Sequence, residues 1–160
     1  MKKVLLCGAT HGSNFGDTIF AYMFYSYLNQ TFPNVEFRFT EMSDHSKLYV
    51  SNKVADKEFI SQASSLVYIS GGYFGESHDE GFRGSVKRYM KYFNFGRKFV
   101  KKNKNIIISG VGAGPINRGF NRKLAVKIFN HAKIINVRDE TSRKYMMSYG
   151  VKNIINETSD

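Results

Sequence analysis

The chain has 160 residues, of which 42% are hydrophobic, and it carries a formal net charge of +11 at neutral pH. This length fits one globular domain over residues 1–160 that buries roughly 70% of its unfolded surface. No stretch approaches the roughly 18 consecutive apolar residues that a membrane-spanning helix needs, so we expect a cytoplasmic protein without a transmembrane segment. The single cysteine, Cys7, excludes an internal disulfide and is expected in the core.

Segments typical of strands and helices alternate along the chain. Strands are expected at residues 2–7, 35–40, 66–70, 105–109, 133–137 and 152–155. Helices are expected at residues 18–31, 54–63, 83–104, 119–131 and 139–149, with a polar loop at 44–52. This alternation predicts an α/β fold: an open, doubly wound, mostly parallel sheet of about six strands with helices on both faces, as in Rossmann-like proteins.

Two of the expected helices are unusual in composition. The helix at 18–31 has apolar groups nearly all round it, which is typical of a helix buried on more than one side, in a layered core or against a second domain. The helix at 83–104 is basic and has no acidic residue. Its nine cations are Arg83, Lys87, Arg88, Lys91, Arg97, Lys98, Lys101, Lys102 and Lys104. They form either a solvated helix face or a surface for an anionic substrate or partner, with nucleic acid the less favoured partner.

The first loop, at residues 8–17, carries the densest cluster of chemically capable side chains. It follows a strand, contains three glycines and opens a helix, which is an arrangement that favours anions. Asp17 lies where we expect the helix to begin, so it is either a helix cap or a general base. The loop is not a P-loop, because no Lys-Ser or Lys-Thr pair follows the last glycine.

Glycine loops also follow the strands at 66–70 and 105–109. The carboxyl ends of parallel strands share one edge of a sheet, so the first three loops are expected to converge on one site. Arg138, at the end of another strand, could hold a carboxylate or phosphate through both arms of its guanidinium. The alternatives are an ion pair with Asp139 or Glu140, or a contact at the start of the next helix.

Two histidines in these loops, His11 and His78, titrate near neutral pH and are candidate proton donors, although a loop histidine is also common as a plain surface residue. The glycines are expected to act through their backbone. No H-x-x-x-H or C-x-x-C motif occurs, so we expect neither a metal site nor a cofactor.

Four motifs, in this order and after successive strands, resemble those of the polysaccharide pyruvyl transferase family. They are Asn14-Phe15-Gly16-Asp17, Ile69-Ser70-Gly71-Gly72, Gly110-Val111-Gly112-Ala113-Gly114-Pro115 and Val137-Arg138-Asp139-Glu140-Thr141-Ser142. Asp160 lies where that family commonly carries an aspartate before its next strand. The resemblance implies a fold like one half of the two-domain GT-B glycosyltransferases. It also implies transfer of pyruvate from phosphoenolpyruvate, as a ketal, onto a sugar of a cell-surface polysaccharide.

The resemblance covers the N-terminal half of the family's two-domain proteins. It therefore implies an enzyme that is incomplete as this chain alone and needs a second-domain partner chain, or that forms a homodimer. The alternative is a non-catalytic glycan- or phosphate-binding module acting in a complex. The expected catalytic residues are Asp17, His11 and His78. The expected substrate- or anion-binding residues are Asn14, Gly16, Gly71, Gly72, Glu76, Gly112, Gly114 and Arg138.

Overall fold

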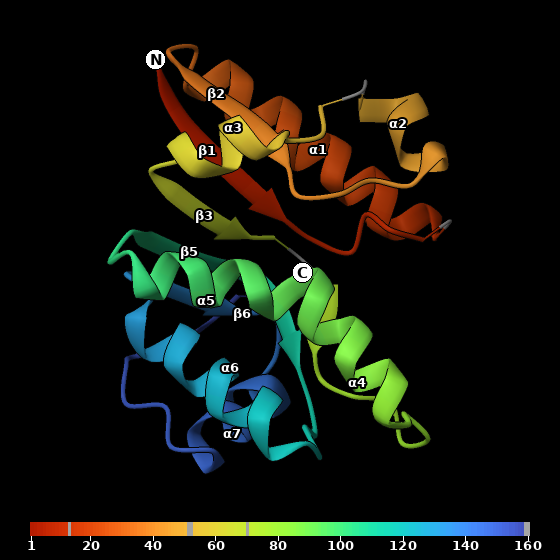
Figure 1. Cartoon of the computed structure of the whole chain (residues 1–160), viewed down its shortest axis with the longest axis vertical. Coiled ribbons are helices and arrows are strands. Elements are labelled where there is room, and N and C mark those ends of the chain that lie inside the picture. The colour runs from red at the N-terminus through yellow and green to blue at the C-terminus, as the bar shows by residue number, and fades with distance from the viewer. Residues whose placement is uncertain (13, 51–52, 70, 159–160) are drawn as a thin grey trace.

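A computed structural model of the chain describes residues 1–12, 14–50, 53–69 and 71–158. Seven strands form one open sheet in the order β2-β1-β3-β5-β6-β7, and β4 pairs with β5 off this path (Figure 1). The strands are β1 (Lys2–Cys7), β2 (Val35–Phe39), β3 (Ser65–Tyr68), β4 (Gly71–Phe74), β5 (Asn105–Ala113), β6 (Ile134–Val137) and β7 (Asn156–Glu157). All their pairings are parallel. The predicted open α/β sheet is therefore confirmed.

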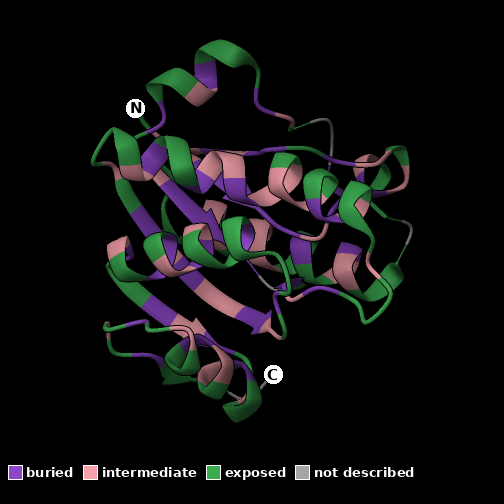
Figure 2. Cartoon of the chain, turned by 60° about the horizontal axis from the view of Figure 1, so that its bottom comes forward, coloured by how far each residue is buried: buried purple, intermediate pink, exposed green. Residues whose placement is uncertain are grey.

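Helices cover both faces of this sheet. They are α1 (Phe15–Thr31), α2 (Asp44–Val50), α3 (Lys57–Gln62), α4 (Phe82–Arg88), the π-helical segment η1 (Tyr89–Phe93), α5 (Asn94–Lys101), α6 (Gly119–His131) and α7 (Glu140–Ser148). One buried cluster joins α1 and α2 to the sheet through Ala21 and Val50. A larger cluster joins α3, α5, α6 and α7 to the other face. Figure 2 shows the strands mostly buried and the outer sides of the helices exposed.

Several local predictions differ from the structure. The strand expected at 105–109 runs on to Ala113, so much of the expected third glycine loop belongs to β5, and the helix expected at 83–104 is divided into α4, η1 and α5. Residues 44–50 form a helix rather than a polar loop, and the Ser43 hydroxyl accepts a hydrogen bond from the Ser46 amide (3.1 Å) at its start. β4 was not expected, because glycines disfavour strands; it forms by pairing with the far half of β5. The last strand lies at Asn156–Glu157 instead of 152–155. The predictions for residues 51–52, Ser70 and Asp160 lie outside the described residues.

The aromatic helix α1 packs on the sheet and against α2, and much of its remaining surface is exposed. Among its residues Thr18 and Ala21 are buried, while Tyr22, Met23 and Tyr27 are 46%, 62% and 63% exposed. In the described part of the chain the contact with α2 brings the Thr18 hydroxyl to 3.3 Å from the Ser46 hydroxyl, and the expected contact with a second domain stays a prediction. No helix in the described part of the chain combines the length and apolarity needed to cross a bilayer.

The π-helical turn η1 joins α4 directly to α5. A π-turn leaves a backbone carbonyl without its usual helical partner. Here the Tyr68 hydroxyl, from β3, donates to the carbonyl oxygen of Tyr92 (2.9 Å). At Gly96, the first turn of α5 comes so close to β3 and α6 that a Cβ atom would meet the Tyr68 hydroxyl of β3 and lie 2.5 Å from Cδ1 of Ile128 on α6. The absence of a side chain at Gly96 thus sets how closely α5 packs on the sheet.

We predict that Gly96→Ala destabilises the protein by roughly 1–3 kcal/mol, because the added methyl overpacks a contact with a buried tyrosine and isoleucine. Urea unfolding measures this change. Gly119→Ala is the matched control, since a Cβ at Gly119 meets nothing within 4 Å. An equal loss of stability in both variants would contradict the packing explanation.

Candidate functional site

A cleft of about 380 Å³ lies at the carboxyl edge of the sheet, where β4, β5 and β6 end. Its lining residues are Gly72, Gly75, Glu76, Ser77, Arg88, Gly112, Ala113, Gly114, Pro115 and Arg138. Five of the residues singled out in the sequence line this cleft: Gly72, Glu76, Gly112, Gly114 and Arg138. The structure therefore brings the second and third glycine loops and the candidate arginine to one place.

Close backbone contact between the two glycine loops shapes the cleft. A Cβ atom at Gly75 would lie 2.9 Å from the Gly114 amide nitrogen, so only glycine permits this approach. Two backbone hydrogen bonds join the loops, from the Gly114 amide to the Phe74 carbonyl (3.1 Å) and from the Glu76 amide to the Pro115 carbonyl (2.7 Å). The cleft wall is consequently backbone rather than side chain, which suits close approach of a small anion.

Gly71 precedes Gly72 in the sequence but does not line the cleft. Its φ is +139°, a conformation open mainly to glycine. A Cβ there would lie 2.9 Å from Cβ of Ala9, so Gly71 lets β4 close against the first loop. Gly71 is buried, whereas Gly72 is exposed in the cleft.

Arg138 lies directly over the backbone of Gly112. A Cβ atom at Gly112 would be 2.7 Å from Nε of Arg138, so the missing side chain makes room for the guanidinium. The Nε atom donates to Oδ2 of Asp139 (3.0 Å), and 44% of the side chain is exposed. Within the described residues, Nη1 and Nη2 make no hydrogen bond. Arg138 therefore forms the ion pair with Asp139 through Nε and still has Nη1 and Nη2 available for a ligand.

Asp139 is the N-cap of α7. Its Oδ1 accepts a hydrogen bond from the Ser142 amide (2.6 Å), and the Ser142 hydroxyl in turn accepts one from the Ala113 amide (2.8 Å) at the cleft. Hydrogen bonds from Ser142, followed by the charge of Arg138, lower the pKa of the Asp139 carboxyl. Asp139 thus connects the start of α7 to both Arg138 and the end of β5.

The first loop places Asn14 and Asp17 differently from expectation. Helix α1 begins at Phe15, and the cap is Asn14 rather than Asp17, because Oδ1 of Asn14 accepts from the Gly16 amide (3.0 Å). Asp17 is the third residue of α1 and is partly buried. Burial raises the pKa of the Asp17 carboxyl, while Asn14 and the positive charge of Arg138 act in the opposite direction. Asp17 is thus free of the capping role and under the electrostatic influence of Arg138.

His11 is the one buried histidine side chain among the candidates, with 6% of it exposed. Its ring meets the Tyr92 ring edge to face at a centroid distance of 5.3 Å, and Nδ1 is 3.3 Å from Oε2 of Glu41. In the described residues neither ring nitrogen has a hydrogen-bond partner. Burial lowers the pKa of His11; Glu41 opposes this shift, and Lys91 and Lys87 add to it.

Among the candidates, Glu76 shares the cleft with Arg138, whereas His78 and the first-loop residues His11, Asn14, Gly16 and Asp17 lie outside its lining. Glu76 lines the cleft but is only 5% exposed, and its carboxylate accepts hydrogen bonds from the Asn117 amide (2.7 Å) and the Ser85 hydroxyl (3.3 Å). It therefore joins α4 to the loop after β5. The His78 side chain is fully exposed, lies outside the cleft lining and has Nδ1 3.3 Å from Oδ1 of Asp79. No group of three or more His, Cys, Asp and Glu side chains suited to a metal occurs among the described residues.

Sequence reasoning missed three residues near this site. Arg88 lines the cleft, donating to the Tyr73 carbonyl (3.1 Å) and pairing with Glu80, and nothing in its helical spacing marked it. Tyr92 contacts His11 because of the π-turn, which the sequence did not reveal. Glu41 could have been found, since it follows a strand, β2, at the same edge of the sheet.

An open parallel sheet with a glycine-lined cleft at its carboxyl edge defines a doubly wound α/β protein of the class that binds ligands at that edge. The family model for polysaccharide pyruvyl transferase matches residues 14–159. The chain therefore belongs to the polysaccharide pyruvyl transferase family, as its motifs predicted. Searches of curated proteins and of solved structures found no match.

We predict that Asp139→Ala costs about 1 kcal/mol of unfolding free energy at neutral pH through loss of the N-cap. Because the folded-state pKa of Asp139 is lowered, its ionised form stabilises the fold above the unfolded pKa of about 3.9. That contribution is lost as the pH falls through the folded pKa. Urea unfolding across pH should show the difference between wild type and variant shrinking on acidification.

Asp139→Asn is the control for this prediction, because asparagine also caps helices but does not titrate. It should retain most of the stability at neutral pH and show no such pH dependence at this position. A cost of Asp139→Ala that stays constant down to strongly acidic pH would contradict the assigned ionisation.

Proposed function

We propose that the chain binds phosphoenolpyruvate in the carboxyl-edge cleft and transfers its pyruvyl group, as a ketal, onto a sugar of a cell-surface polysaccharide. Membership of the polysaccharide pyruvyl transferase family supports the reaction class. The single observation that carries the choice of site is Arg138, which is seated on Gly112 and lines a glycine-rich cleft. Phosphoenolpyruvate offers a carboxylate and a phosphate, and either group suits a guanidinium in this position.

The two cleft arginines have different tasks in this proposal. Arg138 uses only Nε within the protein, so Nη1 and Nη2 bind a carboxylate or phosphate in bidentate fashion. Arg88 is already held by Glu80 and by the Tyr73 carbonyl. It therefore contributes positive potential and shape to the cleft and is not a movable ligand.

The reaction needs one proton donor and one base. A proton is added to the methylene carbon of phosphoenolpyruvate, and a sugar hydroxyl attacks the neighbouring cationic carbon and loses its proton. The bond to the phosphate oxygen then breaks, phosphate leaves, and a second hydroxyl attacks the same carbon and loses its proton to complete the ketal. We assign the base to Asp17, a partly buried carboxylate of the first turn of α1 on which the charge of Arg138 acts; burial raises the pKa of this carboxyl, which makes the carboxylate more basic.

His11 is the proposed proton donor. Burial lowers its pKa, so its protonated form is a stronger acid than an exposed imidazolium. Glu41, 3.3 Å from Nδ1, stabilises the protonated form when it occurs. His78 has no role in the proposal, because it lies in the solvent away from the cleft.

The family resemblance leads us to propose in addition that residues 1–160 correspond to the N-terminal domain of a two-domain transferase. In this arrangement the cleft would hold phosphoenolpyruvate, and a second domain would contribute part of the donor site. We also propose that the protein acts in the cytoplasm, where phosphoenolpyruvate is produced.

We predict that Asp17→Asn lowers pyruvyl transfer by roughly 10²–10⁴-fold, because the amide cannot accept the hydroxyl proton. Phosphate release from phosphoenolpyruvate in the presence of the polysaccharide of the source cells measures the rate. Asp44→Asn is the matched control, since Asp44 is a 99% exposed carboxylate paired with Lys47 on α2. Wild-type turnover by Asp17→Asn would reject Asp17 as the base.

A further inference from the structure

One face of the molecule carries a large excess of positive charge. From Arg83 to Arg138 the sequence contains fifteen lysine and arginine residues and no aspartate or glutamate. Helices α5 and α6 lie side by side on one face of the sheet, and α4 leads into α5 through η1 (Figure 1). Within the described residues, only Arg88 and Arg138 of these fifteen form ion pairs. We call the surface of α4, α5 and α6 the cationic face.

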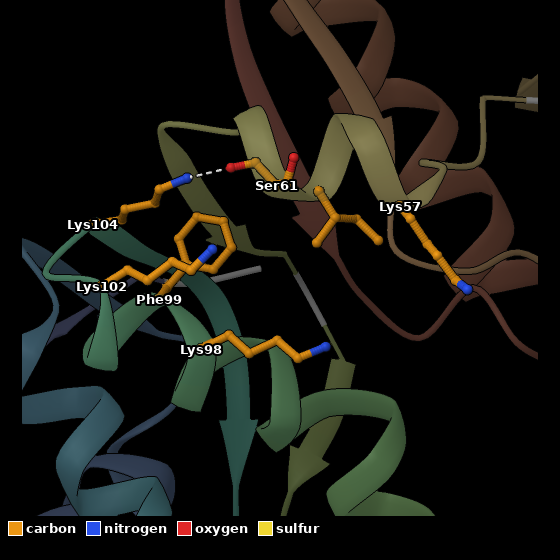
Figure 3. Close-up of a pocket in the computed structure, with 7 residues that line it drawn as sticks. Lys57, Ser61, Lys98, Phe99, Lys102 and Lys104 are labelled. Atoms are coloured by element: carbon orange, nitrogen blue, oxygen red, sulfur yellow. Dashed lines mark hydrogen bonds between the residues drawn. The ribbon is translucent and has the colours of Figure 1, made fainter.

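A first groove of about 420 Å³ lies at the border of this face, between α3 and α5 (Figure 3). Ile60 and Phe99 provide its apolar surface, and Lys57, Lys98 and Lys102 surround it. Lys104, the fourth lysine in Figure 3, is held in place because Nζ donates to the Ser61 carbonyl (2.8 Å). The groove therefore combines an apolar floor with cations and has no carboxylate in its lining.

A second groove, of about 520 Å³, has the same construction on the other side of α5. Its floor includes Val100, Phe120 and Leu124, and its rim carries Arg97 and Lys123 together with other lysines of α5 and α6. Two neighbouring grooves thus repeat one pattern of apolar floor and cationic rim.

Exposed apolar side chains continue this pattern along α4 and η1. Phe82, Val86 and Met90 follow one another at four-residue intervals, which places them along one side of the helix. They are 61%, 38% and 56% exposed. Lys87 and Lys91 each follow one of them in the sequence, so cations flank the apolar row.

We propose that the cationic face is a docking surface for a bilayer of anionic lipids. Lysine and arginine near such a bilayer are attracted to its headgroups, while flanking apolar side chains enter the boundary between headgroups and acyl chains. The cations favour an anionic partner, and the exposed row of Phe82, Val86 and Met90 favours a partner with an apolar interior, such as a lipid bilayer. Nucleic acid would satisfy the cations and could stack on Phe82, but it gives the aliphatic Val86 and Met90 little to bind.

Docking through this face has a consequence for the cleft. Arg88 lies at the last turn of α4 and lines the cleft, and Lys87 and Lys91 lie beside it around a shallow depression with Glu80. The cleft therefore borders the docking surface and would open next to the lipid headgroups. The docking proposal does not depend on the pyruvyl transfer.

Vesicle flotation tests the proposal with the whole chain. We expect it to bind phosphatidylcholine vesicles that contain about 30% phosphatidylglycerol, to ignore pure phosphatidylcholine vesicles, and to dissociate as salt is raised. Absence of binding to the anionic vesicles at low salt, or equal binding to neutral ones, would overturn it.

Two paired variants separate the contributions of charge and apolar area. Lys98→Glu with Lys102→Glu should lower the partition coefficient at least about tenfold, since each cation adds attraction near the surface. Val86→Asn with Met90→Gln should lower it at least about fivefold without changing the net charge. Lys53→Glu with Lys152→Glu, outside the cationic face, is the control with the same charge change and should bind close to wild type.

Binding to single-stranded DNA under the same conditions distinguishes the alternative partner. The proposal predicts that DNA binds more weakly than the anionic vesicles. DNA binding that is tighter than vesicle binding and unaffected by Val86→Asn with Met90→Gln would overturn the lipid assignment. Melting temperatures check that the variants remain folded, and we expect them to be unchanged because the six substituted side chains are all exposed.

Discussion

The parallel pairing of β5 with its neighbours is the constraint on which the cleft depends. β5 is nine residues long, and its first half pairs with β3 while its second half pairs with β4. On its other side β5 pairs with β6, with Val111 opposite Val137. Because of this register, β4, β5 and β6 end next to one another. Arg138, the residue after Val137, is thereby placed over Gly112. A shift of β6 by one residue would turn the neighbouring side chains to the other face and remove the guanidinium from the cleft.

The same edge brings together groups with opposed electrostatic needs. Glu76 is buried and has its carboxylate hydrogen-bonded on several sides, so it serves as a structural link between α4 and the loop after β5. Arg138 is half exposed with part of its fork unused by the described residues. His11 is buried without hydrogen-bond partners in the described chain, which costs stability and is common at functional sites. In the cleft, the hydrogen-bonded Glu76 supports the wall and Arg138 is the group suited to a ligand, while His11 lies at the same edge outside the cleft lining.

Strong periodic segments were predictable from the sequence, and long-range effects were not. β1 and α6 have the predicted bounds, because an uninterrupted apolar run and a 3.6-residue period define them locally. β4 was missed, since its glycines form a strand only when the second half of β5 is beside them. Convergence of Gly112 and Arg138 followed from the rule for parallel strands, but the capping role of Asn14 and the outward direction of His78 needed the actual backbone. The contact of Tyr92 with His11 depends on a π-turn that no sequence pattern indicated.

Thermal unfolding with phosphoenolpyruvate tests the central claim, that Arg138 and the glycine loops form a donor site. At about 100 times its dissociation constant, phosphoenolpyruvate should stabilise the chain by about 2.7 kcal/mol, or roughly 5–10 °C. Inorganic phosphate and a nucleotide at the same concentration should stabilise it less. Arg138→Gln should abolish the shift, and Arg122→Gln, on α6 away from the cleft, should keep it. An equal shift in wild type and Arg138→Gln, or no selective shift in the wild type, would contradict the account.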